Sequence, residues 1–154
     1  MWWISLCVYL LFLWSNGLKI FEHSLSNTDY KLFYHRTADF GPDKYNVSGQ
    51  LKLMQPLKGC DIEQYKSKND ENNQYQQIYQ GEIVLILRGN CTFSKKVHHS
   101  QLLGAKGVII GDYNTSNGEE WIVMSKDSND GYDINIPSIF IPHNTYQWIY
   151  KLLL

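Results

Sequence analysis

The sequence has little net charge and, after its first residues, no long apolar run. Its 14 basic and 15 acidic residues give a formal net charge of −1. Such a balanced chain has no excess of positive charge with which to bind nucleic acid or an anionic membrane surface. A membrane-spanning helix needs about 20 apolar residues, and only the amino terminus approaches that length. We therefore expect no nucleic-acid partner, and no membrane span in the chain beyond its amino-terminal apolar segment.

The sequence also lacks the common catalytic and cofactor motifs. The Gly-x-Ser-x-Gly elbow, the His-Glu-x-x-His zinc motif, the dinucleotide glycine pattern and the P-loop are all missing. His98 and His99 are adjacent, so on a helix they point about 100° apart and cannot share one metal ion. The remaining histidines, His23, His35 and His143, are far apart in sequence, and we interpret all five as solvent-facing. The sequence thus predicts no enzyme, no metal and no cofactor.

The first 17 residues have the features of a secretory signal peptide. Residues 2–14 are apolar except for Ser5, and this run has the length of a secretory h-region rather than of a membrane span. Ser15 and Gly17 place small residues at positions −3 and −1 of a cut after Gly17. We predict a signal peptide over 1–17 and one domain over 18–154, secreted or in the lumen of the secretory pathway. An uncleaved membrane anchor or a buried helix is the alternative.

Cysteine use agrees with an oxidising compartment. Of the three cysteines, Cys7 lies in the predicted leader, which leaves Cys60 and Cys91. We expect these two to form a disulfide, which would stabilise the fold by about 3 to 4 kcal/mol. Two buried free thiols are the alternative. A free Cys91 near a helix start could be reactive and support a thiol-dependent enzyme, but a disulfide to Cys60 would remove that thiol.

Three Asn-x-Ser/Thr triplets also suit the secretory pathway and predict a glycoprotein. They begin at Asn46, Asn90 and Asn114. Asn46 and Asn114 lie in polar, turn-rich surroundings and are the better candidates. Asn90 adjoins the predicted disulfide and a helix start, so crowding disfavours its modification.

The apolar patterns predict a mixed α+β domain. We expect strands at 30–34, 47–54, 82–87, 107–111, 119–124 and 136–141, and helices at 93–103 and 144–154. The runs at 82–87 and 107–111 are continuously apolar, as in strands buried on both faces. Thr92 is a plausible N-cap for the helix between them, whose apolar face would contain Phe93, Val97, Gln101 and Gly104. This order predicts a right-handed parallel crossover. The polar segment 66–77 is interpreted as a surface insertion.

The turn at Arg88-Gly-Asn follows the first buried strand, where α/β folds often bind anions. The glycine pattern that such sites use is missing. We therefore expect Arg88 to pair with a carboxylate or with turn carbonyls. Asp61, Glu63 and Asp112 are the carboxylates that folding could bring near it.

Taken together, the central stretch resembles the protease-associated (PA) domain. The family signature is an apolar strand ending in Arg-Gly, then Cys-x-Phe, a Lys-bearing helix, Gly-Ala and a second apolar strand. The matching residues are Ile83–Phe93 (IVLILRGNCTF), Lys95-Lys96, Gly104-Ala105 and Val108–Ile110. Ile136–Ile141 (IPSIFI), Ala38–Gly41 (ADFG) and Gly59-Cys60 are similar to further parts of the family pattern. The resemblance covers residues 30–154.

The resemblance implies a β-barrel-like domain with flanking helices and no catalytic machinery. In this view Arg88, Gly89 and Phe93 are structural: Cys91 joins the turn to Cys60, Gly89 lets the chain turn, and Phe93 anchors the helix. Within the family the chain looks most like small secreted glycoproteins that contain little else. We expect it to bind a protein or peptide partner in the secretory pathway or outside the cell. The alternative is a truncated ectodomain of a larger membrane receptor, ubiquitin ligase or protease, cut short at Leu154.

Overall fold

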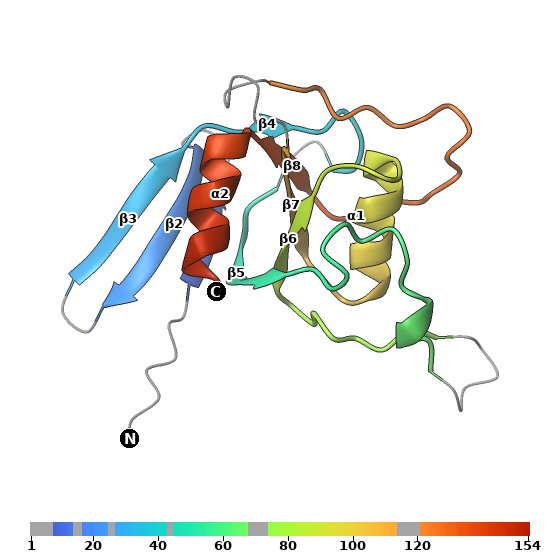
Figure 1. Ribbon diagram of the computed structural model, residues 1–154, viewed down its shortest axis with the longest axis horizontal. Coiled ribbons are helices and arrows are strands. Elements are labelled where there is room, and N and C mark those ends of the chain that lie inside the picture. The colour runs from blue at the N-terminus through green and yellow to red at the C-terminus, as the bar shows by residue number, and fades with distance from the viewer. Residues whose placement is uncertain (1–7, 14–16, 25–26, 43–44, 68–73, 114–120) are drawn as a thin grey trace.

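The computed structural model is an α+β fold, as the sequence predicts (Figure 1). It describes residues 8–13, 17–24, 27–42, 45–67, 74–113 and 121–154. The strands of these residues are β1 (Val8–Leu13), β2 (Gly17–Ser24), β3 (Asn27–Phe33), β4 (Arg36–Thr37), β5 (Val47–Leu53), β6 (Ile83–Leu87), β7 (Gly107–Gly111) and β8 (Ser138–Ile141). The helices are α1 (Phe93–Leu102), α2 (His143–Leu152) and the short 3₁₀-helix η1 (Glu63–Tyr65).

The strands form one sheet in the order β3-β2-β1-β5-β6-β7-β8-β4. The strands β5, β6, β7 and β8 are parallel neighbours. The pairs β1–β2 and β2–β3 are antiparallel, and β1 joins them to the rest of the sheet by pairing antiparallel with β5. The predicted strand–helix–strand unit is therefore present as β6, α1 and β7. Because parallel strands share a direction, β6, β7 and β8 all end at one edge of the sheet, which we call the carboxyl edge.

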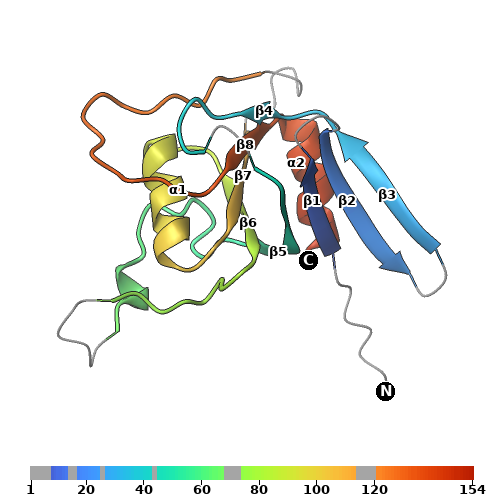
Figure 2. The ribbon, with the colours of Figure 1, turned by 180° about the vertical axis from the view of Figure 1, so that it is seen from behind.

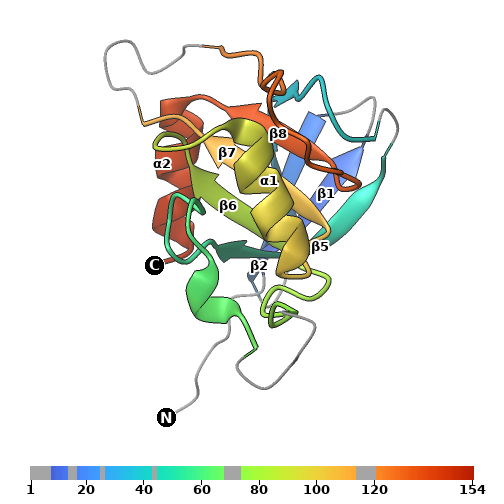
Figure 3. The same cartoon turned by 90° about the vertical axis from the view of Figure 1, so that its right-hand side faces the viewer.

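The two helices cover opposite faces of the parallel strands. Figure 3 shows α1 in front of β6, β7 and β8, and Figures 1 and 2 show α2 on the other side, beside β2 and β3. The side chains of β6 alternate between two apolar clusters: Ile83 and Leu85 pack on the α2 side, Val84 and Ile86 on the α1 side. A strand buried on both faces must be apolar at every position, which explains the continuous apolar runs.

Helix α1 begins where the sequence predicts but buries a different face. Thr92 is the N-cap, and its hydroxyl accepts a hydrogen bond from the backbone N–H of Lys95 at 3.2 Å. The buried residues of the helix are Ser94, Lys96, Val97 and Ser100. Of the four residues of the predicted face, Val97 is buried, whereas Phe93, Gln101 and Gly104 are half-buried. A lysine takes the place expected for an apolar side chain.

The close approach of α2 to the sheet depends on Gly111. A Cβ atom at this position would lie 2.1 Å from Cδ2 and 2.7 Å from Cβ of Tyr146. Tyr146 is buried in the first turns of α2, so its ring has little room to move. Burial raises the pKa of its hydroxyl to about 12. The last residue of β7 must therefore lack a side chain.

Several strands differ from the prediction. The sequence did not indicate β1, β2 or β4 as strands. The expected strand at 119–124 is wrong over its described part, because residues 121–124 have no regular structure and are held by a bond from Asp39 N–H to the Met124 carbonyl. The predicted leader contains β1, while residues 1–7 and 14–16 lie outside the described residues. Cleavage after Gly17 stays a prediction.

Replacing Gly111 by alanine should destabilise the fold by about 3 kcal/mol, because an added methyl overpacks the contact with Tyr146 and such overpacking typically costs about 1–3 kcal/mol. Urea unfolding would measure the change. A Gly131→Ala control adds a methyl that meets nothing within 4 Å, and it should shift stability by less than about 0.5 kcal/mol. Equal stability of the two variants would contradict the packing of α2 on this glycine.

Candidate functional site

The segment after β6 forms a tight corner before α1. Its backbone turns through two successive residues with positive φ, Gly89 at 105° and Asn90 at 72°. Glycine enters this region without steric penalty, and asparagine is among the few other residues that do so readily. The chain therefore reverses direction within a few residues, which places the corner beside the loop that follows β5.

The predicted disulfide joins this corner to that loop. Cys60 and Cys91 are bonded with a Cα–Cα distance of 5.8 Å and a sequence separation of 31. Both residues are half-buried. Of the predicted turn residues, Gly89 makes the turn, and Phe93 is half-buried against the α1-side cluster.

Lys96 lies beneath the corner and is fully buried, with 0% of its surface exposed. Its ammonium donates hydrogen bonds to the carbonyl of Lys58 and, at 2.7 Å, to the carbonyl of Gly89. The sulfur of Cys60 lies 3.4 Å from the same nitrogen. An ammonium has three N–H donors, and here three acceptors surround it. Lys96 therefore joins the same two segments as the disulfide.

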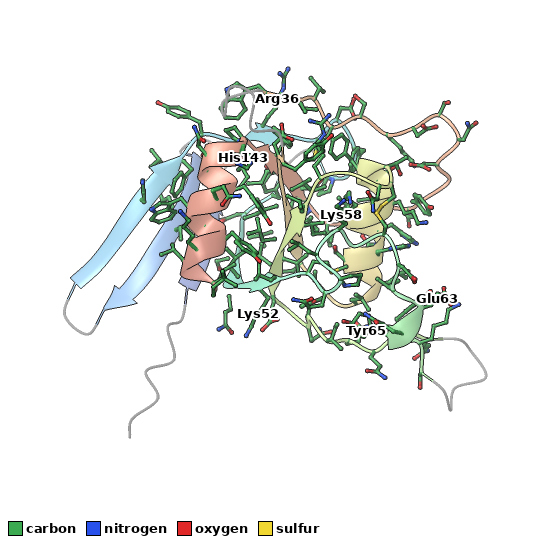
Figure 4. All side chains as sticks on the ribbon, in the orientation of Figure 1. Arg36, Lys52, Lys58, Glu63, Tyr65 and His143 are labelled. Carbon is green, nitrogen blue, oxygen red and sulfur yellow. A yellow bond between two sulfur atoms is a disulfide. The ribbon has the colours of Figure 1, made fainter. Side chains whose placement is uncertain are left out.

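The loop before Cys60 has two further polar contacts to the corner and α1. The ammonium of Lys58 donates to the side-chain oxygen of Asn90 at 3.0 Å, and Figure 4 labels Lys58 in this region. His99 places Nδ1 2.8 Å from the carbonyl of Gly59. Burial lowers the pKa of His99, whereas this hydrogen bond acts in the opposite direction and raises it. The loop is thus held by the disulfide, by hydrogen bonds from two ammonium groups and by the contact with His99.

Arg88 projects from the carboxyl edge. Its Nη1 atom lies 3.1 and 3.3 Å from the two carboxylate oxygens of Asp112, which is 1% exposed. The guanidinium also lies over the ring of Tyr113, 5.6 Å from its centroid. Of the three carboxylates considered for Arg88, the fold brings Asp112 to it. The pair joins the ends of β6 and β7.

The amino end of α1 is occupied by a carboxylate from a distant loop. Asp130 accepts hydrogen bonds from the hydroxyls of Thr92, at 2.8 Å, and Ser94. These hydroxyl bonds lower the pKa of Asp130, the Ser94 bond most. A negative charge here is also favoured by the positive end of the helix dipole. Sequence reasoning missed this contact because it joins residues 36 to 38 apart.

The predicted glycosylation sites differ in their surroundings. Asn46 is exposed immediately before β5, and Asn90 is exposed but bonded to Lys58. Thr92, the hydroxyl residue of the Asn90 triplet, is used as the helix cap. Asn114 lies outside the described residues. Glycosylation at all three positions stays a prediction.

The histidines are less exposed than the sequence analysis expected. His35, His98, His99 and His143 are half-buried. His98 stacks on Tyr132 with ring centroids 4.7 Å apart, and His143, labelled in Figure 4, places Nδ1 3.1 Å from the carbonyl of Asp112. Within the described ranges no group of three or more His, Cys, Asp or Glu residues could hold a metal ion. His98, His99 and His143 thus contact other segments of the fold.

The family follows from comparison with known proteins. The model of the PA domain matches residues 40–149, well over half of the chain. The chain belongs to the PA domain family. The match contains the corner, the disulfide, the Arg88–Asp112 pair and most of α2, so the site described above lies within the family domain.

Relatives include much larger proteins. The chain is 30% identical over 122 residues to signal peptide peptidase-like 4 of Oryza sativa subsp. japonica, covering 75% of this chain and 19% of that protein. It is 31% identical over 111 residues to receptor homology region, transmembrane domain- and RING domain-containing protein 3 of Arabidopsis thaliana, covering 71% and 24%. The chain thus spans about a fifth of the length of these relatives.

Solved structures agree on the fold. An aminopeptidase from Aneurinibacillus sp. strain AM-1 aligns with a TM-score of 0.56 at 17% identity, covering 97% of this chain and 27% of that chain. A zinc aminopeptidase from Bacillus subtilis aligns with a TM-score of 0.54 at 17% identity, covering 95% and 31%. At this identity the likeness concerns the fold alone.

Lys96 should give the stability a distinct pH dependence. Burial, and to a smaller extent the charge of Lys58, lowers the pKa of Lys96 from 10.5 to about 8. Between these values the unfolded chain holds more protons than the folded one, so stability rises with pH in this window. The free energy of unfolding of the wild type, relative to a Lys96→Met variant, should therefore increase between pH 8 and pH 10.

Urea denaturation at several pH values, with the disulfide intact, would measure this difference. A Lys95→Met variant, altered one residue away on the half-buried side of the helix, is the matched control and should follow the wild type. If the difference in unfolding free energy between the wild type and the Lys96→Met variant is constant from pH 8 to pH 10, Lys96 does not change its protonation on unfolding in this range.

Proposed function

We propose that this PA domain is a non-catalytic protein-interaction module that works in the lumen of the secretory pathway or outside the cell. Its disulfide supports an oxidising compartment. No helix among the described residues is long and apolar enough to cross a membrane. The polar side chains of the site are engaged in holding the corner and the strand ends together, which supports a binding role rather than a chemical one.

The carboxyl edge is the face that supports binding best. Arg88 follows β6, Tyr113 lies two residues after β7, and His143 begins α2 after β8. Open parallel sheets commonly bind ligands at this edge. Tyr113 is 56% exposed, and Arg88 lies against its ring. An exposed aromatic ring beside a fixed guanidinium is the single observation that carries the proposal, because Tyr and Arg are the residue types enriched at binding hot spots.

The geometry favours an extended peptide segment as the occupant. Arg88 uses Nη1 to bind Asp112, and a guanidinium has five N–H donors in all. The other donors can bind a carbonyl or carboxylate of a partner without breaking the internal pair. Tyr113 then offers an apolar face with a polar tip to a neighbouring side chain. The pair with Asp112 fixes the guanidinium, which lowers the entropy lost on binding.

Site-specific photo-crosslinking would test this face. A benzophenone amino acid placed at Tyr113 should give a discrete adduct with a protein from a secretory-pathway extract. Excess unlabelled wild-type protein should compete the adduct away, whereas excess Tyr113→Ala protein should compete about tenfold less well, since hot-spot truncation costs at least about 1–2 kcal/mol. The surface substitution should leave the melting temperature unchanged.

The control places the same crosslinker at Gln80, which is exposed and precedes β6 at the opposite edge of the sheet. This position should give no saturable adduct. Equal adducts from both positions, or none that wild-type protein competes away, would contradict a binding role for the carboxyl edge.

A second candidate function is that of a lumenal domain within a larger membrane protein. The observation that favours it is the fraction of the relatives that the chain spans, 19% and 24% in the two plant proteins. One of these relatives is named for a transmembrane domain and a RING domain. Sequencing the transcript beyond the codon for Leu154 would decide between the two candidates.

A further inference from the structure

The two sulfurs of the disulfide have unlike electrostatic surroundings. Cys60 Sγ is 3.4 Å from the ammonium of Lys96, which is buried and fixed by two backbone carbonyls. Cys91 is followed by Thr92, whose hydroxyl donates to the carboxylate of Asp130 at 2.8 Å. Cys60 Sγ therefore has a cation in direct contact, whereas the two neighbours of Cys91 are bonded to charges of opposite sign, Asn90 to Lys58 and Thr92 to Asp130.

We propose that Cys91 is a site of mixed-disulfide formation with small thiols of the glutathione type, with Cys60 as the leaving group. The thiolate of the small molecule attacks Sγ of Cys91 and forms a new sulfur–sulfur bond. The Cys60–Cys91 bond breaks, and its electron pair leaves on Cys60 as a thiolate. The incoming thiol has given its proton to solvent. One disulfide is consumed and one is formed, so no other oxidant or reductant is needed.

Lys96 determines which sulfur leaves. In thiol–disulfide exchange the sulfur that carries the more stable thiolate leaves faster. A thiolate on Cys60 would lie against a desolvated ammonium, where the attraction between charges is much stronger than in water. The third N–H of Lys96 is available for this sulfur, since the other two are directed at Lys58 and Gly89.

Other charged groups near the two cysteines do not reverse this preference. The ammonium of Lys58 is bonded to the side chain of Asn90 rather than to a sulfur. Asp61 adjoins Cys60, but its carboxylate is exposed and accepts from the backbone N–H of Glu63 at 3.0 Å. The amino end of α1 would favour a thiolate on Cys91. That end is already occupied by Asp130, whose charge opposes a second negative charge there.

The corner can keep its shape when the disulfide opens. Lys96 bonds a carbonyl on each side of the disulfide, and Lys58 bonds Asn90 across the same gap. These contacts hold Cys60 close to Cys91, so the Cys60 thiolate can attack the mixed disulfide, expel the small thiol and restore the original bond. The modification is therefore reversible, and both cysteines are half-buried rather than sealed in the core.

Trapping the first exchange product would test this assignment. The intact protein is treated with reduced glutathione for a time that gives low conversion, quenched with acid and alkylated with N-ethylmaleimide. Peptide mass spectrometry then locates both labels. We expect glutathione on Cys91 and the maleimide on Cys60, in about tenfold excess over the reverse pattern, as a leaving thiol of lower pKa predicts. Equal labelling, or glutathione mainly on Cys60, would overturn the proposal.

Two variants separate the charge of Lys96 from general effects on the fold. Lys96→Met should slow the appearance of the adduct about tenfold and remove the preference for Cys91. Lys95→Met, changed at the adjacent position, should match the wild type in both measurements. An unchanged rate and preference in a folded Lys96→Met protein would contradict the role of Lys96. Should that variant fail to fold, the labelling pattern of the wild type alone decides the assignment.

Discussion

The geometry of the central site depends on a buried ammonium ion. Lys96 has no exposed surface and binds one carbonyl from the loop after β5 and one from the corner after β6. Backbone carbonyls at such a turn have no sheet partner, and leaving them buried without a donor costs about 1–3 kcal/mol each. The lysine supplies those donors from the helix that the corner introduces. One side chain on α1 therefore contacts both the corner and the loop, in addition to the disulfide that joins them.

This arrangement determines where the carboxyl edge lies. With the corner fixed, the backbone N–H of Arg88 bonds the carbonyl of Gly111 at 2.9 Å, and its guanidinium reaches Asp112. Because Gly111 has no side chain, Tyr146 of α2 can pack directly against the sheet at this position. The same few residues thus connect both helices to the ends of the parallel strands, which gives the exposed Tyr113 a rigid support.

The sequence predicted the parts of this fold whose burial is uniform, since β6 and β7 lie between two apolar clusters and contain only apolar residues and glycine. It also predicted the Thr92 cap, which depends only on adjacent residues. The disulfide was predictable because only one pair of cysteines remains beyond the predicted leader. It missed β2, in which Leu18, Lys19 and Ile20 alternate but Phe21 and Glu22 do not continue the alternation. The segment 121–124 has the composition of a strand, which is why a strand was expected there. In the structure the side chains of Trp121 and Val123 are exposed to solvent.

Lys96 illustrates why the rest of the site could not be predicted. A lysine next to another lysine on a helix is predicted to be exposed to solvent, because lysine is rarely buried. The one indication of its burial in the sequence was its position on the helix. Lys96 lies four residues before Ser100 and one before Val97, on the face that packs against the sheet. Recognising it requires knowing that the corner presents two carbonyls to that face, which is a property of the folded backbone.

The charged side chain at position 96 is better explained by the two carbonyls that it orients than by a gain in the stability of the fold. Burying an ammonium costs several kcal/mol, and an apolar side chain of similar length would avoid that penalty. Such a side chain would leave the carbonyls of Lys58 and Gly89 without the donor they have now. The disulfide fixes one distance between the two segments, whereas the ammonium fixes the direction of two carbonyls as well. The disulfide therefore adds one distance to a corner whose two carbonyls the ammonium already directs.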